Sequence, residues 1–290
     1  MPYPNQTAII THASSDMSFP YAEAHGILQL PDYVIFGEQQ YRTLLDISSE
    51  EFFRRLETEP ELPTSSPPSA GAFAEAFTQA AAQGASGIIC LVITGAMSGC
   101  FNYAESARRM LEADGFPIPI RVYDSAQSSH GLDFMAAFAA RRANGGMAMD
   151  DIIAALDALR PAVANYFIFD SLKYLRRSGR VGAIRALAAD TLGLRPILTF
   201  QDGVVRDIGM SRRGYRDGIE TILTRYRAEA GGGDEVIVFH SRMEEEARGI
   251  IAQIREATPD IPVRTGGVGP VMGLYSSPKC IGVVFRKKPC

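Results

Sequence analysis

Short apolar runs of strand length alternate along the chain with longer segments in which apolar residues recur every three to four positions. Thr7–Thr11, Ile88–Ile93 and Ile118–Tyr123 have the strand pattern, and segments of helical period separate them. This alternation is typical of a parallel sheet whose crossover helices cover its faces. Ile88–Ile93 is apolar at every position, which indicates a central strand buried on both faces. The pattern therefore predicts an α/β domain with a mostly parallel sheet.

Recognisable capping residues mark the helices of this first half. Ser48-Ser49-Glu50-Glu51 predicts a capping box that begins a helix reaching about Glu57, because serine and glutamate side chains can bind free amides of a first turn. Leu62–Ser69 contains three prolines and is predicted to be a rigid loop. Its last residue, Ser69, would cap a helix over Ala70–Gln83 that stops at Gly84. Further helices are predicted over Asn102–Ala113, Gly131–Ala143 and Asp150–Leu159.

The pattern changes after Pro161. Asp202-Gly203 separates two strand-like runs and is a hairpin signal, since both residues tolerate the turn conformation that a tight hairpin needs. The strands predicted in this half are Tyr166–Phe169, Ile197–Phe200, Val204–Ile208, Glu235–His240 and Ile281–Phe285, and the helices are Tyr215–Glu229 and Glu244–Ala257. We therefore predict two domains, an N-terminal α/β domain over residues 1–161 and a C-terminal α/β domain over residues 162–290.

Composition and charge narrow the classes of function. The chain has 290 residues, of which 46% are hydrophobic, and a formal net charge of −4. An acidic chain without a long basic run argues against a nucleic-acid partner. The first residues have neither the basic nor the apolar segment of a signal peptide, and the most apolar segment, Gly87–Met97, is too short to cross a bilayer. The expected location is the cytoplasm, without stable membrane insertion.

Cysteine and histidine positions give no sign of a metal site or a cofactor. The four cysteines lack CxxC spacing, and Cys90 and Cys280 lie in apolar, strand-like runs, so we predict buried free thiols. The four histidines are scattered without the spacing of metal ligands. His12 follows the first strand and could reach the rim of the sheet, although a single histidine there is also compatible with a structural role.

Two hydroxyl-rich loops are the candidate binding elements. Pro63–Ser69 leads into one helix with Thr64 and Ser65, and Thr94–Gly99 joins a buried strand to another helix with Thr94, Gly95, Ser98 and Gly99. Ligands of open parallel sheets bind outside the carboxyl ends of the strands, where helix N-termini offer free amides. Hydroxyls added to such amides predict an anion site without lysine or arginine. Each loop taken alone is also compatible with ordinary helix capping.

Several other chemistries find less support in the residues. Ser98 is not in a Gly-x-Ser-x-Gly segment, as an α/β-hydrolase nucleophile would be, and no P-loop sequence occurs. Arg180 and Arg212 belong to short basic segments that are compatible with ordinary solvated charge.

At these loops the sequence resembles the DegV family. That family's Thr-Asp-Ser, Pro-Thr-Thr-Ser-Gln-Pro and Ser-Ser-x-Leu-Ser-Gly-Thr-Tyr segments are similar to residues 11–13, 63–68 and 94–101. An Asp-Ser pair matches residues 124–125, an Asp-Leu-x-x-Leu-x-x-Gly-Gly-Arg stretch is similar to residues 170–180, and a later arginine falls on Arg212. The ordered set covers nearly the whole chain.

The resemblance implies a fatty-acid-binding protein without catalysis of its own, in bacteria often the carrier subunit of a fatty acid kinase. Such a carrier holds the acyl chain between its two domains, and a separate ATP-dependent subunit phosphorylates the carboxylate. On this basis Thr64 and Ser65 would hold the carboxylate from one side and the Thr94–Ser98 loop from the other. Arg180 and Arg212 would serve kinase docking or phosphate transfer.

This chain departs from the family pattern at three positions near the expected carboxylate site. The family's aspartate is His12, its second serine is Gly95, and a histidine near the C-terminus is Tyr275, which can still donate a hydrogen bond. A long-chain fatty acid is the expected ligand. The alternatives are a sensor of a phosphate or nucleotide ligand at the same helix N-termini and a serine-dependent acyl hydrolase using Ser98.

Overall fold

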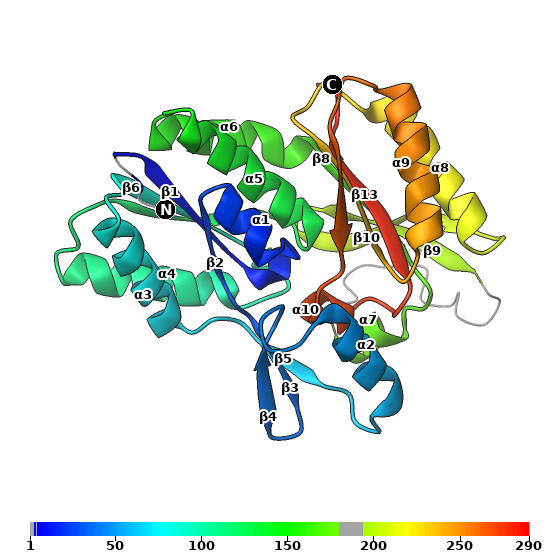
Figure 1. Ribbon diagram of the computed structural model, residues 1–290, viewed down its shortest axis with the longest axis horizontal. Coiled ribbons are helices and arrows are strands. Elements are labelled where there is room, and N and C mark those ends of the chain that lie inside the picture. Colours follow the sequence, from blue (N-terminus) through cyan, green and yellow to red (C-terminus); the bar gives the residue numbers. More distant parts are fainter. Residues whose placement is uncertain (1–2, 4, 180–193, 290) are drawn as a thin grey trace.

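The computed structural model describes residue 3 and residues 5–179 and 194–289, which form three β-sheets with helices packed around them (Figure 1). The first sheet has the order β2-β1-β6-β7 and is parallel throughout. Its strands are β1 (Thr7–His12), β2 (Ile27–Leu30), β6 (Gly87–Val92) and β7 (Ile120–Asp124). Every residue of β6 is buried, which confirms the prediction of a central strand.

Helices cover both faces of this sheet, with the pair α3 and α4 on one side and the pair α5 and α6 on the other (Figure 1). The helices up to α6 are α1 (Phe19–Ala24), α2 (Ser49–Thr58), α3 (Ala70–Ala82), α4 (Cys100–Ala113), α5 (His130–Asn144) and α6 (Met149–Leu159). Ser48 caps α2 through the amide of Glu51, and Ser69 caps α3 through the amide of Ala72, as predicted. The Glu51 carboxylate binds Arg54, so only the serine half of the capping box forms.

A small third sheet, with the order β4-β3-β5, extends from the first one. It consists of β3 (Tyr33–Phe36), β4 (Gln39–Arg42) and β5 (Thr64–Ser66). The sequence predicted a loop over residues 62–69, but its middle is a strand that pairs antiparallel with β3, with Tyr33 opposite Ser66. A three-residue strand depends on its partner rather than on local propensity, which is why the proline-rich pattern did not reveal it.

The second sheet has the order β10-β9-β8-β13-β11-β12, and its neighbours are antiparallel except for β11 and β12. Its strands are β8 (Val163–Phe169), β9 (Arg195–Gln201), β10 (Val204–Ser211), β11 (Val236–Ser241), β12 (Val263–Gly267) and β13 (Cys280–Arg286). Asp202 and Gly203 both have positive φ angles, of 52° and 76°, as a tight hairpin turn requires. The predicted hairpin is thereby confirmed, whereas β12 was not predicted.

Strand β8 divides the core of this second half into two layers. Ala164, Tyr166 and Ile168 belong to a core shared with α8 (Tyr215–Glu229) and α9 (Glu244–Ala257), whereas Phe167 and Phe169 belong to the core shared with the first sheet. This follows from the two-residue period of a strand, which points successive side chains to opposite faces. Helix α5 packs against strands of both sheets and joins them. Two short helices, α7 (Lys173–Arg177) and α10 (Pro270–Gly273), lie near the sheet ends.

Candidate functional site

A cavity of about 230 Å³ lies between the first and second sheets. On the side of the first sheet its wall comes from segments that follow the parallel strands: Ser14 after β1, Asp32 after β2, Ile93 after β6 and Ser128 after β7. Parallel strands end at the same edge of a sheet, so residues far apart in the sequence meet there. The cavity thus occupies the position where open α/β folds bind their ligands.

The opposite wall is mainly apolar. It consists of Phe167, Phe169, Phe200, Val205 and Phe239 from the second sheet, with Val268, Val271 and Met272 beside them. The Phe167 ring lies 5.0 Å from that of Phe169 and 5.8 Å from that of Phe200, measured between centroids. Burial of one methylene group against such a wall contributes about 0.8 kcal/mol. The wall is therefore suited to a hydrocarbon chain.

Hydroxyl groups from three segments meet at the polar part of this cavity. Ser65 lies on β5, Ser98 and Gly99 precede α4, and Tyr275 follows α10; all four line the cavity. The Ser65 Oγ and the Tyr275 hydroxyl lie 3.0 Å apart, so one donates a hydrogen bond to the other. Ser98 Oγ accepts a hydrogen bond of 3.2 Å from the Cys100 amide at the start of α4. The structure thus brings these four predicted residues to one cavity.

Three other predicted residues, Thr64, Thr94 and Gly95, lie outside the lining. Thr64 is exposed at the start of β5. Thr94 Oγ1 donates a hydrogen bond of 2.9 Å to the Gly203 carbonyl, which ties the loop to the hairpin of the second sheet. A Cβ atom at Gly203 would lie 2.5 Å from that hydroxyl, so the contact needs glycine. The exposed Gly95 donates its amide hydrogen to Asp124.

His12 is fully buried behind the cavity wall, not on its surface. Its Nε2 accepts a hydrogen bond of 3.1 Å from the Ile93 amide, so the ring proton is on Nδ1, which lies 2.9 Å from Asp32 Oδ2. Asp32 lines the cavity itself and was not predicted. Its position after Leu30-Pro31 carries no pattern that would mark it as functional.

Cys100 lies next to the His12–Asp32 pair, with its Sγ 3.6 Å from His12 Nε2. Asp32, His12 and Cys100 therefore form a row. An Asp-His-Cys order can activate a thiol for nucleophilic attack. Here, however, the lone pair of Nε2 is bound by the Ile93 amide, and Cys100 is fully buried. Burial raises the pKa of the Cys100 thiol well above its ordinary value. The thiol therefore stays protonated and out of reach of a ligand, and the row has a structural role.

The alternative of a serine nucleophile finds no paired base in the part of the chain that the structure describes. Among the described residues no histidine is hydrogen-bonded to Ser98 or Ser65. The partners of Ser98 and Ser65 are instead the Cys100 amide and the Tyr275 hydroxyl. Both hydroxyls are thus arranged as hydrogen-bonding groups.

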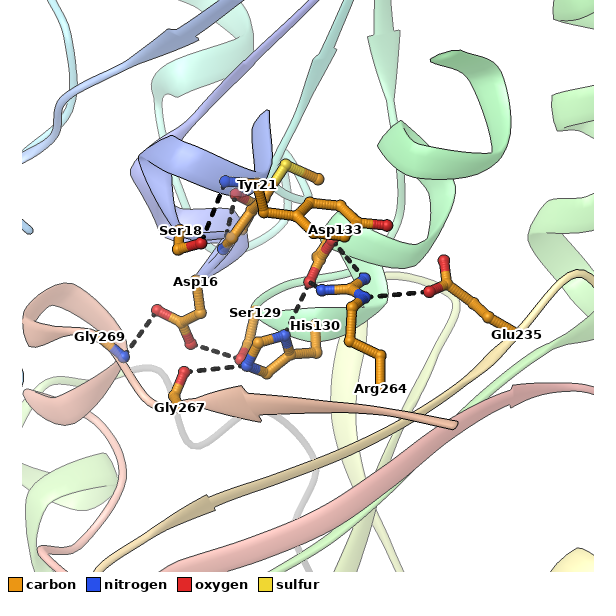
Figure 2. A network of polar contacts seen from close by, with 12 residues as sticks. Asp16, Ser18, Tyr21, Ser129, His130, Asp133, Glu235, Arg264, Gly267 and Gly269 are labelled. Carbon is orange, nitrogen blue, oxygen red and sulfur yellow. Dashed lines mark hydrogen bonds and ion pairs between the residues drawn. The ribbon is translucent and has the colours of Figure 1, made fainter. Parts of the chain in front are cut away.

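A second polar cluster ties the two sheets together beside the cavity (Figure 2). The buried carboxylate of Asp16 accepts hydrogen bonds of 2.5 Å from Ser129 Oγ and 2.9 Å from the Gly269 amide. Burial raises the pKa of Asp16 to about 7, and the nearby His130 and these two donors only partly offset that rise. Ser129 lines the cavity and Gly269 is the N-cap of α10, so Asp16 connects two parts of the wall.

His130 and Arg264 complete this cluster. His130 Nδ1 lies 2.9 Å from Asp133, and Nε2 lies 2.9 Å from the Gly267 carbonyl (Figure 2). Arg264 binds both oxygens of Asp133, at 2.8 and 2.9 Å. Burial alone would raise the pKa of Asp133, but the hydrogen bonds and charges of His130 and Arg264 hold it below its ordinary value. Through these contacts α5 holds the edge strand β12 in place.

Neither predicted arginine belongs to the described wall of the cavity, and the two predicted thiols are buried. Arg212 is exposed directly after β10 and does not line the cavity, and Arg180 falls outside the described residues. Cys90 and Cys280 are free and buried, as predicted. The described part of the chain holds no group of three or more residues that could bind a metal ion, and no helix there is long and apolar enough to cross a membrane.

Comparison with known proteins identifies the family. A family model described as "Uncharacterised protein, DegV family" matches residues 6–288. The chain belongs to the DegV family. A DegV domain-containing protein of Streptomyces coelicolor is 29% identical over 283 residues, which are 97% of this chain and 98% of that protein. The DegV resemblance seen in the sequence is thereby confirmed.

Solved DegV structures share the fold. A DegV protein of Thermus thermophilus, described with fatty acid binding, has 26% identity and a TM-score of 0.86, covering 98% of this chain and 100% of that one. DegV of Bacillus subtilis, described as a fatty acid binding protein, has 26% identity and a TM-score of 0.83 with the same coverage. A stearic acid-binding protein of Eubacterium ventriosum has 25% identity and a TM-score of 0.85, covering 97% and 98% of the two chains.

Proposed function

We propose that this DegV protein binds a long-chain fatty acid in the cavity between its two sheets. The observation that carries the proposal is the composition of the wall, in which phenylalanines of the second sheet face the hydroxyls of Ser65, Ser98 and Tyr275. A chain of roughly fifteen methylenes would gain about 12 kcal/mol from burial, before the cost of ordering it. The hydroxyls and loop amides then need only orient the polar end. Three solved relatives are described as binding fatty acids.

The protein would act as a carrier without catalysis of its own. The buried thiol of Cys100 and the absence of a histidine hydrogen-bonded to Ser98 among the described residues support this role. The carrier would present its ligand to a separate ATP-dependent kinase subunit that forms an acyl phosphate, with the exposed Arg212 available for docking. The two halves that enclose the ligand would be the domains 1–161 and 162–290.

The test is to extract the purified protein with organic solvent and to identify the lipids by mass spectrometry. We expect a long-chain fatty acid in near-stoichiometric amount. The delipidated protein should then bind added oleate or palmitate and gain thermal stability, since a ligand that binds only the folded state stabilises it. An empty extract together with no binding of either acid would refute the proposal. Stabilisation by ATP or a sugar phosphate alone would favour the sensor of phosphate ligands.

A further inference from the structure

Asp32 places a carboxylate in the wall of the cavity. Its side chain is 2% exposed, and the residue belongs to the lining of the cavity. Two donors hold it: the Ser14 amide at 2.5 Å from Oδ2, and His12 Nδ1 at 2.9 and 3.0 Å from the two oxygens. A carboxylate has about four acceptor positions, so these donors leave some of its capacity free.

Within the described part of the chain, no positively charged side chain is paired with this carboxylate. The His12 ring is neutral, because its Nε2 accepts the Ile93 amide hydrogen. None of the described residues that line the cavity is a lysine, an arginine or a histidine. The other titratable side chains of the described cavity wall are Tyr103, Tyr275 and Cys280, and the Cys100 thiol lies against His12 behind that wall. None of these four groups carries a positive charge in either protonation state.

Strand pairing places Asp32 between the two hydroxyl-bearing loops. Asp32 directly precedes β3, whose Tyr33 lies opposite Ser66 on β5, so the Pro63–Ser69 segment is its neighbour on one side. On the other side His12 connects it to Ile93, which begins the loop that carries Ser98. The carboxylate therefore lies in the part of the cavity where a ligand's polar end would meet Ser65 and Ser98.

We propose that the polar end of the ligand binds in uncharged form, as a protonated carboxyl group or a hydroxyl that donates a hydrogen bond to Asp32. This inference rests on the proposed function, since it assumes an acyl chain in the cavity. Two carboxylates that share one site without a cation cannot both be ionised, so the bound acid and Asp32 hold one proton between them. A hydroxyl brings its own hydrogen and needs no further proton.

Binding of a fatty acid in this form changes the number of protons bound by the protein and its ligand. An aliphatic carboxyl group titrates near pH 4.3, as glutamate does, so a free fatty acid is an anion at neutral pH. Binding it as the shared acid takes up one proton from solvent per molecule bound. Its dissociation constant should then rise about tenfold for each pH unit between 6 and 8. A fatty alcohol of the same length should bind without proton uptake.

The experiment measures oleate and oleyl alcohol binding to the delipidated full-length protein at pH 6, 7 and 8, below the concentration at which either ligand aggregates. Calorimetry in two buffers with different heats of ionisation counts the protons. Asp16, beside the cavity, has a pKa raised to about 7 and could also change affinity in this pH range. Oleyl alcohol carries no titrating group, so a pH dependence of its binding measures that contribution. The proposal is supported if the dissociation constant of oleate rises steeply with pH while that of oleyl alcohol stays constant. An oleate affinity independent of pH, with no proton uptake, overturns it, whereas failure of both ligands to bind overturns the proposed function.

The variant Asp32→Asn tests the residue itself. Removal of the charge should raise the affinity for oleate at pH 8 by tenfold or more and flatten its pH dependence. Glu75→Gln, which removes an exposed carboxylate on α3, is the matched control and should behave as the wild type. If a folded Asp32→Asn protein shows the same dependence of oleate affinity on pH as the wild type, Asp32 is excluded as the acceptor. If that variant does not fold, the wild-type comparison of acid and alcohol still decides the proposal.

Discussion

The hydroxyl of Ser65 lies 3.0 Å from the phenol of Tyr275, although 210 residues separate them in the chain. Ser65 comes from the small third sheet and Tyr275 from the segment after α10, so the contact joins the two halves at the cavity. A pair of hydroxyls can donate to a ligand while one of them stays bonded to the other. This pair is therefore the most direct place to test ligand orientation.

The variant Tyr275→Phe should weaken fatty acid binding about five- to twelvefold while leaving the fold intact. The change removes one hydroxyl but keeps the ring, and a lost hydrogen bond of this kind costs about 1 to 1.5 kcal/mol. Because the chain contains no tryptophan, affinity is best measured by displacement of a fluorescent fatty acid. Tyr41→Phe is the control, since its hydroxyl binds Gln39 on the third sheet away from the cavity. Equal affinities of the two variants would contradict the assigned role.

The variant Gly266→Ala should destabilise the protein by about 2 kcal/mol or more. A Cβ atom there would lie 2.3 Å from His130 Cε1, and the ring cannot retreat because both of its nitrogens are bonded. Urea unfolding gives the free energy of unfolding. Gly249→Ala, at an exposed position of helix α9 with open space around it, should instead stabilise by up to about 1 kcal/mol. Similar effects of both substitutions would show that the packing of β12 on His130 is loose.

Asp16 should make the folded state less stable as the pH rises from about 4 to about 7. Its folded pKa of about 7 lies above the unfolded value near 3.9, so in this window the folded state holds a proton that the unfolded state has lost. Above pH 7 the whole cost of burying the charge remains, on the order of a few kcal/mol.

The comparison of wild type with Asp16→Asn isolates this contribution. The asparagine should match the wild type near pH 4 and be more stable at pH 8, because an amide can keep the contacts with Ser129 and the Gly269 amide without a charge. Unfolding free energies of both proteins across this range provide the measurement. A constant difference between them at every pH would mean that Asp16 does not titrate there.

The variant Arg212→Ala should leave fatty acid affinity unchanged and reduce acyl phosphate formation by at least tenfold when a fatty acid kinase subunit and ATP are present. Arg212 is exposed and lies outside the cavity wall, so its loss should not alter the ligand site. Arg255→Ala removes an exposed arginine from helix α9, in another part of the second half, and serves as the control. Loss of lipid affinity in Arg212→Ala would show that the proposed role is wrong.

Local patterns were sufficient to predict most of the framework. The helix bounds Tyr215–Glu229 and Glu244–Ala257 match the structure, and Ser69 caps α3 as predicted. These features depend on neighbours within a few residues, through helical periodicity and capping bonds. Strands β3, β4 and β5 were missed because each is short and depends on a partner elsewhere in the chain.

The polar site was predictable only in part. The rule that ligands bind at the carboxyl ends of parallel strands led to the loops of Ser65 and Ser98, and the family resemblance added Tyr275. Thr94 belongs to the same loop as Ser98, yet its hydroxyl is used by Gly203 on the second sheet. One hydroxyl of this loop lines the cavity and the other holds two segments together. Packing decides between these two roles, and the spacing of residues in the sequence does not reveal it.

The sequence by itself determined the family, most of the longer helices and strands in their order, and the segments that gather at one edge of the first sheet. Hydrophobic period, turn residues and caps act over a few positions, so they can be read without knowledge of the rest of the chain. Tertiary structure decided that a buried carboxylate, Asp32, would line the cavity beside neutral His12, with no cation in the described wall. Charge balance in a cavity depends on residues brought together from distant segments, and for that reason only the packed molecule defines it.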